Sequence, residues 1–274
     1  MTMPMPPRRT TADYQALDAA HHIHAFLDQK ALNAEGARVI VKGEGLYLWD
    51  NDGQRYLDGM SGLWCTCLGY GRKDLNAAAA RQMEQLAYYN LFFHTTHPAV
   101  IELSELLFSL LPAHYSHAIY TNSGSEANEA LIRTVRRFWQ IQGQPQKKIM
   151  IGRWNGYHGS TLAATALGGM KFMHEMGGTI PDVAHIDEPY WFAHEGNLSP
   201  EEFGLQAARQ LEDKILELGA DKVAAFVAEP FQGAGGMIIP PATYWPEIQR
   251  ICRKYDVLLC ADEVIGGFGR TGEW

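Results

Sequence analysis

Two apolar segments that each end in an acidic residue constrain the fold of this chain most strongly. Residues 223–228 (VAAFVA) lead directly into Glu229, and residues 257–261 (VLLCA) lead directly into Asp262 and Glu263. A short, continuous apolar run is typical of a parallel strand that is buried on both faces. Because ligands bind at the carboxyl ends of such strands, we expect these acids to lie in a binding site. There a positive partner or water must satisfy them, since an unpaired buried charge is costly.

The segments around these two runs alternate between helix and strand patterns. We expect further strands at residues 118–120 and 148–152, and helices at residues 74–86, 98–111, 125–142, 161–167, 200–218 and 244–255. Such alternation predicts an α/β fold with a mostly parallel sheet and helices on both faces.

The N-terminal part of the chain follows a different pattern. Residues 1–11 are rich in Pro and Thr, which favours a disordered or loosely docked arm. Residues 13–28 have the apolar spacing of an amphipathic helix. Three short β runs, separated by the turn sequences GEG and NDG, then predict a small antiparallel meander. We expect residues 1–60 to belong to a small lobe, and residues 61–274 to a large domain that is incomplete at its C-terminus.

Composition excludes several classes of function. The chain has 274 residues, 46% of them hydrophobic, and a net charge of −8, as in a soluble globular protein. It contains no basic block, so we expect no nucleic-acid partner. It also contains no apolar run of eighteen residues and no signal-peptide pattern, so we expect no membrane span.

Cysteine and histidine residues favour ordinary structural roles. We expect the four cysteines, which lie within or beside apolar stretches, to be buried reduced thiols, as in a cytoplasmic protein. These are Cys65, Cys67, Cys252 and Cys260. A helix that carries His21, His22 and His24 could hold a metal. Clustered helix-surface histidines are more often simply exposed, and we expect no metal.

Two loops that follow strands carry candidate ligand-binding groups. In residues 121–128 (TNSGSEAN), Ser123, Gly124 and Ser125 stand at a helix N-terminus, where free amides and hydroxyls can bind a phosphate. An ordinary N-cap is an equal interpretation. After residues 148–152, Tyr157 can stack on a planar cofactor beside His158, or form a surface aromatic corner. The GxGxxG match at residues 267–272 opens no helix, so we expect no dinucleotide fold there.

Six segments together resemble the class III aminotransferases that depend on pyridoxal phosphate (PLP), in the ω-amino acid:pyruvate branch, and most closely its putrescine/spermidine:pyruvate members. The likeness extends over about residues 14–274. Its segments are residues 58–67, 89–98, 122–128, 155–160, 228–233 and 261–264. The resemblance implies PLP-dependent transferase fold type I and, when the protein is complete, a homodimer.

The resemblance also implies roles for individual residues. Asp262 pairs with the ring nitrogen of PLP and keeps it protonated, so that the ring accepts electrons. Tyr157 stacks on the ring, with Val264 against its opposite face, and Glu229 lies near its oxygen edge. The remaining cofactor-binding residues are Ser123, Gly124, Ser125 and His158, and the substrate pocket is lined by Trp64, Phe92 and Ala234.

The implied reaction is transfer of an amino group from an ω-amine or diamine to pyruvate, which yields an aldehyde or ketone and alanine. In this family a Schiff-base lysine follows the aspartate by roughly 30 residues. The twelve residues after Asp262 contain no lysine, so we expect an N-terminal part of the enzyme that is inactive by itself. The alternatives are a non-catalytic fragment and another PLP enzyme of the same fold, an aminomutase or decarboxylase.

Overall fold

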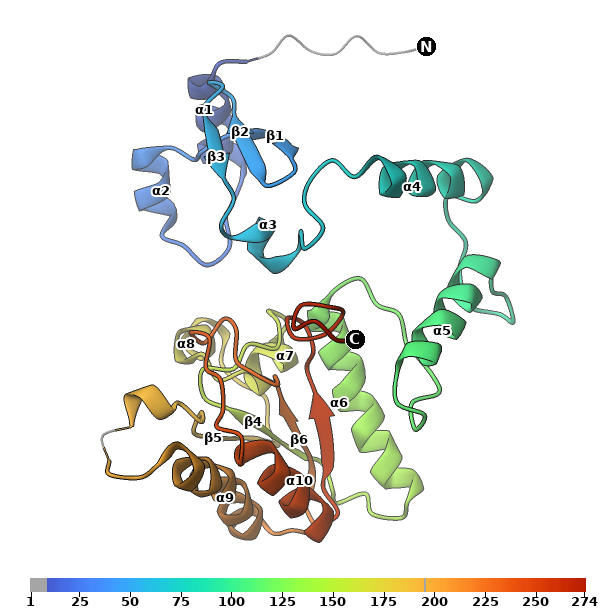
Figure 1. Ribbon diagram of the computed structural model, residues 1–274, viewed down its shortest axis with the longest axis vertical. Coiled ribbons are helices and arrows are strands. Elements are labelled where there is room, and N and C mark those ends of the chain that lie inside the picture. The colour runs from blue at the N-terminus through green and yellow to red at the C-terminus, as the bar shows by residue number, and fades with distance from the viewer. Residues whose placement is uncertain (1–8, 195) are drawn as a thin grey trace. The chain divides into compact units, whose positions relative to one another are not determined.

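The computed structural model describes residues 9–194 and 196–274, which divide into two compact units (Figure 1). The first unit ends at Pro98 and the second begins at Ala99. The lobe boundary that we expect after residue 60 lies inside the first unit and stays a prediction. Most of the expected arm, residues 1–11, lies outside the described residues.

The first unit contains the predicted antiparallel meander. Strand β2 pairs with β1 on one side and with β3 on the other. The elements of this unit are α1 (Thr11–His21), α2 (Gln29–Glu35), β1 (Ile40–Glu44), β2 (Tyr47–Asp50), β3 (Arg55–Leu57), α3 (Ser61–Trp64) and α4 (Lys73–Gln85). Among its described residues the buried ones include no large apolar side chain, as expected for a meander that buries little by itself.

The single helix expected over residues 13–28 is wrong in its second half, because α1 ends before it and α2 begins only at Gln29. α1 ends at His21, and His22 is extended, with φ −120° and ψ 132°. Asp28 then starts α2: its carboxylate accepts hydrogen bonds from the amides of Lys30 and Ala31. An aspartate at this N-cap position favours a new helix over continuation of the old one.

α3 is a left-handed turn. Its four residues, Ser61–Trp64, have φ between 48° and 67°, a region that costs energy for residues other than glycine. The Asp58 carboxylate holds this turn, since it accepts hydrogen bonds from the Gly62 amide at 2.8 Å and from the Tyr70 hydroxyl at 2.6 Å. Trp64 therefore lies in a strained segment that the Asp58 carboxylate stabilises.

The second unit is an α/β layer structure with a parallel four-stranded sheet in the order β5-β4-β6-β7. Its elements are α5 (Pro98–Leu110), α6 (Gly124–Ile141), β4 (Ile149–Arg153), α7 (Leu162–Leu167), α8 (Lys171–Gly177), β5 (Val183–Ile186), a 3-10 turn (Trp191–Ala193), α9 (Pro200–Leu218), β6 (Val223–Ala228), α10 (Tyr244–Lys254) and β7 (Leu258–Ala261). Every predicted helix from residue 74 onward, and three of the four strands predicted in this unit, are confirmed to within one residue at each end.

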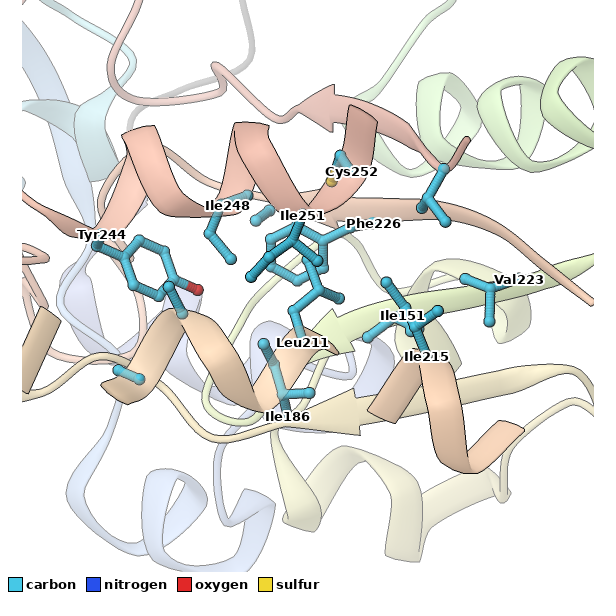
Figure 2. Close-up of a cluster of buried hydrophobic side chains, with 14 residues drawn as sticks. Ile151, Ile186, Leu211, Ile215, Val223, Phe226, Tyr244, Ile248, Ile251 and Cys252 are labelled. Carbon is cyan, nitrogen blue, oxygen red and sulfur yellow. The ribbon is translucent and has the colours of Figure 1, made fainter. Parts of the chain in front are cut away.

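Helices pack on both faces of the sheet, as predicted (Figure 1). α9 and α10 cover one face, where Leu211 and Ile248 contact Ile151 and Phe226 (Figure 2). α6 and α7 cover the other face, where Trp139 packs over β6 and donates its indole N–H to the Ala224 carbonyl. β6 is buried along its whole length because it lies between two strands and two helical layers.

Two predictions about this unit are wrong. Residues 118–120 are not a strand, and Ile119 is exposed, because no described strand pairs with them. β7 is not buried on both faces: it is the edge strand of the described sheet and leaves Leu259 and Ala261 exposed.

The cysteine prediction holds in part, because Cys252 is buried, but Cys65 and Cys67 are exposed. Both exposed thiols follow the left-handed turn in the unit that has little core. Burial raises the pKa of Cys252 to about 12 and that of Cys260 to about 11, which makes these two thiols unreactive at neutral pH.

Candidate active site

The carboxyl ends of three parallel strands bring the predicted site residues of the second unit to one edge of the sheet. β4, β6 and β7 end at Arg153, Ala228 and Ala261. The loops that follow them contribute residues 154–160, 229–236 and 262–264. The N-terminus of α6 joins the same edge through hydrogen bonds to two of these loops. This is the place at which open α/β sheets bind ligands.

Asp262 is the centre of this arrangement. Its Oδ2 atom accepts a hydrogen bond from Nδ1 of His158 at 2.8 Å and another from Nδ2 of Asn128 at 3.0 Å. Its Oδ1 atom accepts one from the Val264 amide at 3.2 Å. Burial by itself would raise the pKa of Asp262, but the hydrogen bond and charge of His158, together with the Asn128 bond, hold it below its ordinary value. The carboxylate is therefore ionised at neutral pH.

The N-terminus of α6 is packed tightly against the loop after β4. Ser123 caps the helix by accepting the Glu126 amide, and the Ser125 hydroxyl accepts the Ser160 amide at 2.9 Å. Gly159, with φ +130°, has no room for a side chain, because an added Cβ would lie 2.5 Å from the Ser125 hydroxyl. A glycine is required here so that the loop can approach the helix end.

Glu229 connects two loops from inside the protein. Its side chain accepts the Tyr157 amide at 3.1 Å with one oxygen and the Gly233 amide at 2.9 Å with the other. Only 2% of the residue is exposed. Burial raises its pKa, an effect that these two amides and the nearby positive groups only partly oppose. Glu229 thus positions the loop of Tyr157 against the loop of Ala234.

Two further residues at this edge were not predicted from the sequence. Asn128 donates to both Asp262 and the His158 carbonyl. Its position one helical turn after Gly124 was the available signal, because residues four apart share a helix face. Arg153 is 1% exposed and donates to the Glu229 carbonyl, which ties the end of β4 to that of β6. Like the two acids, it is a charged residue that ends an apolar strand.

Not every predicted site residue is brought to this edge by the structure. Ser123, Gly124, Ser125, Tyr157, His158, Glu229, Asp262 and Val264 all lie on its loops or on the α6 N-terminus. Ala234 lines a cleft of about 530 Å³ together with Trp154, Asn155 and Glu188. Trp64 and Phe92 belong to the first unit, so their role toward a substrate stays a prediction.

Comparison with known sequences identifies the family. The pattern described as "Aminotransferase class-III" matches residues 30–274, and the chain belongs to this family. The putrescine–pyruvate aminotransferase of Pseudomonas aeruginosa is 57% identical over 265 residues, which cover 96% of this chain and 58% of that protein. The chain therefore spans a little over half the length of this curated relative.

Solved structures agree with the family and the fold. The (S)-enantioselective omega-transaminase from Thermomicrobium roseum has a TM-score of 0.93 at 40% identity, covering 96% of this chain and 59% of that one. The omega transaminase from Pseudomonas jessenii in complex with PMP has a TM-score of 0.90 at 39% identity, covering 93% and 57%. Class III aminotransferases are PLP-dependent. In the described part of the chain, no helix is both long and apolar enough to cross a membrane.

The residues at the sheet edge fit a cofactor with a phosphate group and a protonated ring nitrogen. In the described part of the chain, the amides of Gly124 and Ser125 have no acceptor, as expected for the first turn of a helix. A Cβ at Gly124 would meet nothing within 4 Å, which leaves open space beside these amides. Asp262, ionised and held by two donors, supplies the negative charge that a protonated ring nitrogen requires.

Proposed function

We propose that the complete protein transfers an amino group from an ω-amine or diamine to pyruvate with PLP as cofactor, and that this chain supplies most of the cofactor site. The observation that carries the proposal is the ionised Asp262, fixed by His158 and Asn128 at the carboxyl end of β7. A diamine such as putrescine is the leading donor, because the Pseudomonas aeruginosa relative is a putrescine–pyruvate aminotransferase.

In this proposal each residue has a separate task. The Gly124 and Ser125 amides bind the phosphate, helped by the positive end of the α6 dipole. Asp262 holds a proton on the ring nitrogen, and its partners His158 and Asn128 keep it ionised and oriented. When bound, PLP withdraws electrons from the carbon next to the transferred nitrogen. Tyr157 and Val264 contact the two faces of the ring.

Glu229 has a supporting task. Its two amide contacts fix the Tyr157 loop, so a ring held by Tyr157 keeps one orientation. Ala234 borders the substrate pocket, to which Trp64 and Phe92 contribute when the protein is complete. The family resemblance puts the Schiff-base lysine roughly 30 residues after Asp262, so we assign that role to no lysine among residues 1–274. No observation favours an aminomutase, a decarboxylase or a non-catalytic role.

The proposal also includes a homodimer and a cytoplasmic location. The structure describes all four cysteines, and none of them forms a disulfide, which supports a reducing compartment. The dimer rests on the family resemblance.

The decisive experiment uses the full-length protein and measures the alanine formed from pyruvate and putrescine. We expect Asp262→Asn to lower the rate by about 100-fold or more, the scale for loss of a fixed electrostatic partner. Asp256→Asn removes the same charge in the turn before β7, and we expect it to retain full activity. An active Asp262→Asn variant would contradict the role of the acid, and a wild type that forms no alanine from any diamine would contradict the activity.

A second experiment uses the 274-residue chain by itself. After borohydride reduction in the presence of PLP, we expect no lysine to be modified at a stoichiometric yield in a peptide map. Specific labelling of one lysine would place the Schiff base within this chain and overturn our assignment.

A further inference from the structure

Three potential metal ligands meet at the end of α1, in the first unit. His22 Nδ1 lies 2.8 Å from one oxygen of Asp18, and His24 Nε2 lies 2.8 Å from the other. The imidazole rings of His22 and His24 are 4.2 Å apart between centroids. Their three potential ligand atoms all lie within 4.8 Å of one another. We call Asp18, His22 and His24 the α1 cluster.

The sequence explains why these three side chains converge. Asp18 and His22 are four residues apart and share one face of the last helical turn. The chain leaves the helix at His22, which is extended, and this brings His24 back toward Asp18. The His24 amide donates to the Gln29 side chain at 3.0 Å, which fixes the loop in this position. His21 lies on the same turn but outside the cluster.

α1 itself is anchored, so the cluster is held on a defined support. At its N-terminus Thr10 and Asp13 form a capping box. The Thr11 hydroxyl donates to Asp52 at 2.6 Å, and the Gln15 side chain donates to the Ala37 carbonyl at 3.0 Å. These bonds connect the helix to the meander and to the segment before it. The backbone that carries the cluster is therefore held in place, and small side-chain rotations suffice to bring the ligand atoms around an ion.

We infer that the α1 cluster binds a divalent transition-metal ion of the Zn²⁺ class. Two imidazole nitrogens and one carboxylate oxygen are a donor set that suits Zn²⁺, Ni²⁺ and Cu²⁺, whereas Mg²⁺ and Ca²⁺ prefer oxygen alone. Ligand atoms about 2 Å from a tetrahedral ion lie roughly 3.3 Å from one another. Each imidazole nitrogen lies 2.8 Å from an oxygen of Asp18, and the three ligand atoms lie within 4.8 Å of one another, so a small adjustment reaches that spacing. The ion replaces the protons that the two imidazoles share with Asp18 and joins the end of α1 to the loop before α2.

Calorimetric titration of ZnCl₂ into the untagged, EDTA-treated chain tests this inference. We expect one ion per chain in the wild type, and binding at least about tenfold weaker in His24→Ala and in His22→Ala, since even indirect changes at metal sites cost about that much. His21→Ala is the matched control and should bind like the wild type. If a second ion binds elsewhere, for example at the exposed Cys65 and Cys67, it adds a further binding step that is common to all variants and leaves the comparison among them unchanged.

Thermal unfolding separates a metal site from a purely structural cluster. We expect Zn²⁺ to raise the melting temperature of the wild type and of His21→Ala, but not that of His24→Ala. If the His24→Ala variant does not fold, Asp18→Asn, which keeps the size of the side chain, replaces it. The inference is wrong if Zn²⁺ does not bind, if the cluster variants bind as tightly as the wild type, or if His21→Ala loses as much affinity as they do.

Discussion

The Nδ1 atom of His158 lies 2.8 Å from Oδ2 of Asp262 and joins the loop after β4 to the end of β7. Asn128 reaches the same oxygen from α6. Two donors on one carboxylate oxygen favour the ionised acid over the protonated one. The negative charge at this edge of the sheet is thus a property of three segments rather than of one residue.

Replacement of His158 by Phe is expected to destabilise the second unit by about 1.5–3 kcal/mol at pH 7, the range for a hydrogen bond to a charged group. The pKa of Asp262 is below its ordinary value in the folded protein. Its ionised contacts therefore stabilise the fold fully above about pH 4, and this contribution is lost as the pH falls through the folded pKa. The difference between variant and wild type should shrink over the same range.

Urea unfolding at several pH values measures this effect. His117→Phe, which removes an exposed imidazole, is the control and should follow the wild type. A His158→Phe variant as stable as the wild type at pH 7 would show that Asp262 does not depend on this bond.

Glu229 should show the opposite dependence on pH. Burial raises its pKa in the folded protein, so its contribution to stability is fully present below about pH 4.3 and is lost as the pH rises through the folded pKa. Glu229→Gln removes this titration. Glutamine has only one acceptor oxygen, so its NH2 group would face the backbone N–H of either Tyr157 or Gly233. This loss of one hydrogen bond should lower the free energy of unfolding by about 1–3 kcal/mol.

The melting temperature of Glu229→Gln, followed from pH 4 to pH 8, tests this prediction. Glu217→Gln changes an exposed glutamate on α9 and serves as the control. Parallel pH curves for the wild type and Glu229→Gln would contradict the raised pKa.

Gly159→Ala tests the close approach between the β4 loop and the start of α6. The added methyl group would lie 2.5 Å from the Ser125 hydroxyl in a backbone with φ +130°. We expect a loss of more than about 1 kcal/mol in the free energy of unfolding. Gly236→Ala has a comparable backbone, with φ +118°, but meets nothing within 4 Å. Equal losses in the two variants, measured by urea unfolding, would show that strain alone matters and that the packing against Ser125 does not.

Tyr70→Phe tests how the left-handed turn of α3 is held. The hydroxyl of Tyr70 is the main reason why the pKa of Asp58 lies below its usual value. Without it, we expect hydrogen exchange of the amides in residues 58–70 to become several-fold faster, because the turn opens more often. Tyr88→Phe changes an exposed tyrosine of the same unit and should leave these amides as they are. Unchanged exchange in Tyr70→Phe would mean that the backbone amides that donate to Asp58 suffice to hold the turn closed.

Much of the fold could be predicted because the spacing of apolar residues along the sequence differs clearly between its strands and its helices. β6 is a pure apolar run between a helix and an acid, and both of its ends were found. β5 was missed, since it is four residues long and contains His185, which interrupts the apolar pattern. Residues 118–120 were assigned to a strand on local preference alone. A strand also needs a partner, which local sequence does not reveal.

The site was predictable in its members but not in its contacts. Asp262, His158 and Gly124 were found because each follows a strand or begins a helix. The bond between Asn128 and Asp262 joins residues 134 positions apart, and no spacing rule reaches that far. Likewise, the α1 cluster depends on where the first helix ends, and the periodicity of residues 13–28 did not show that end.

The meeting of three distant segments on one carboxylate also limits how this gene can diverge. An amide at position 262 would turn its NH2 group toward the donors His158 and Asn128 or toward the Val264 amide, whereas an apolar residue there would leave these donors without an acceptor. Neighbouring positions on β7 can exchange one apolar side chain for another. Positions 128, 158 and 262 are therefore coupled, and the effects of substitutions at them should not simply add.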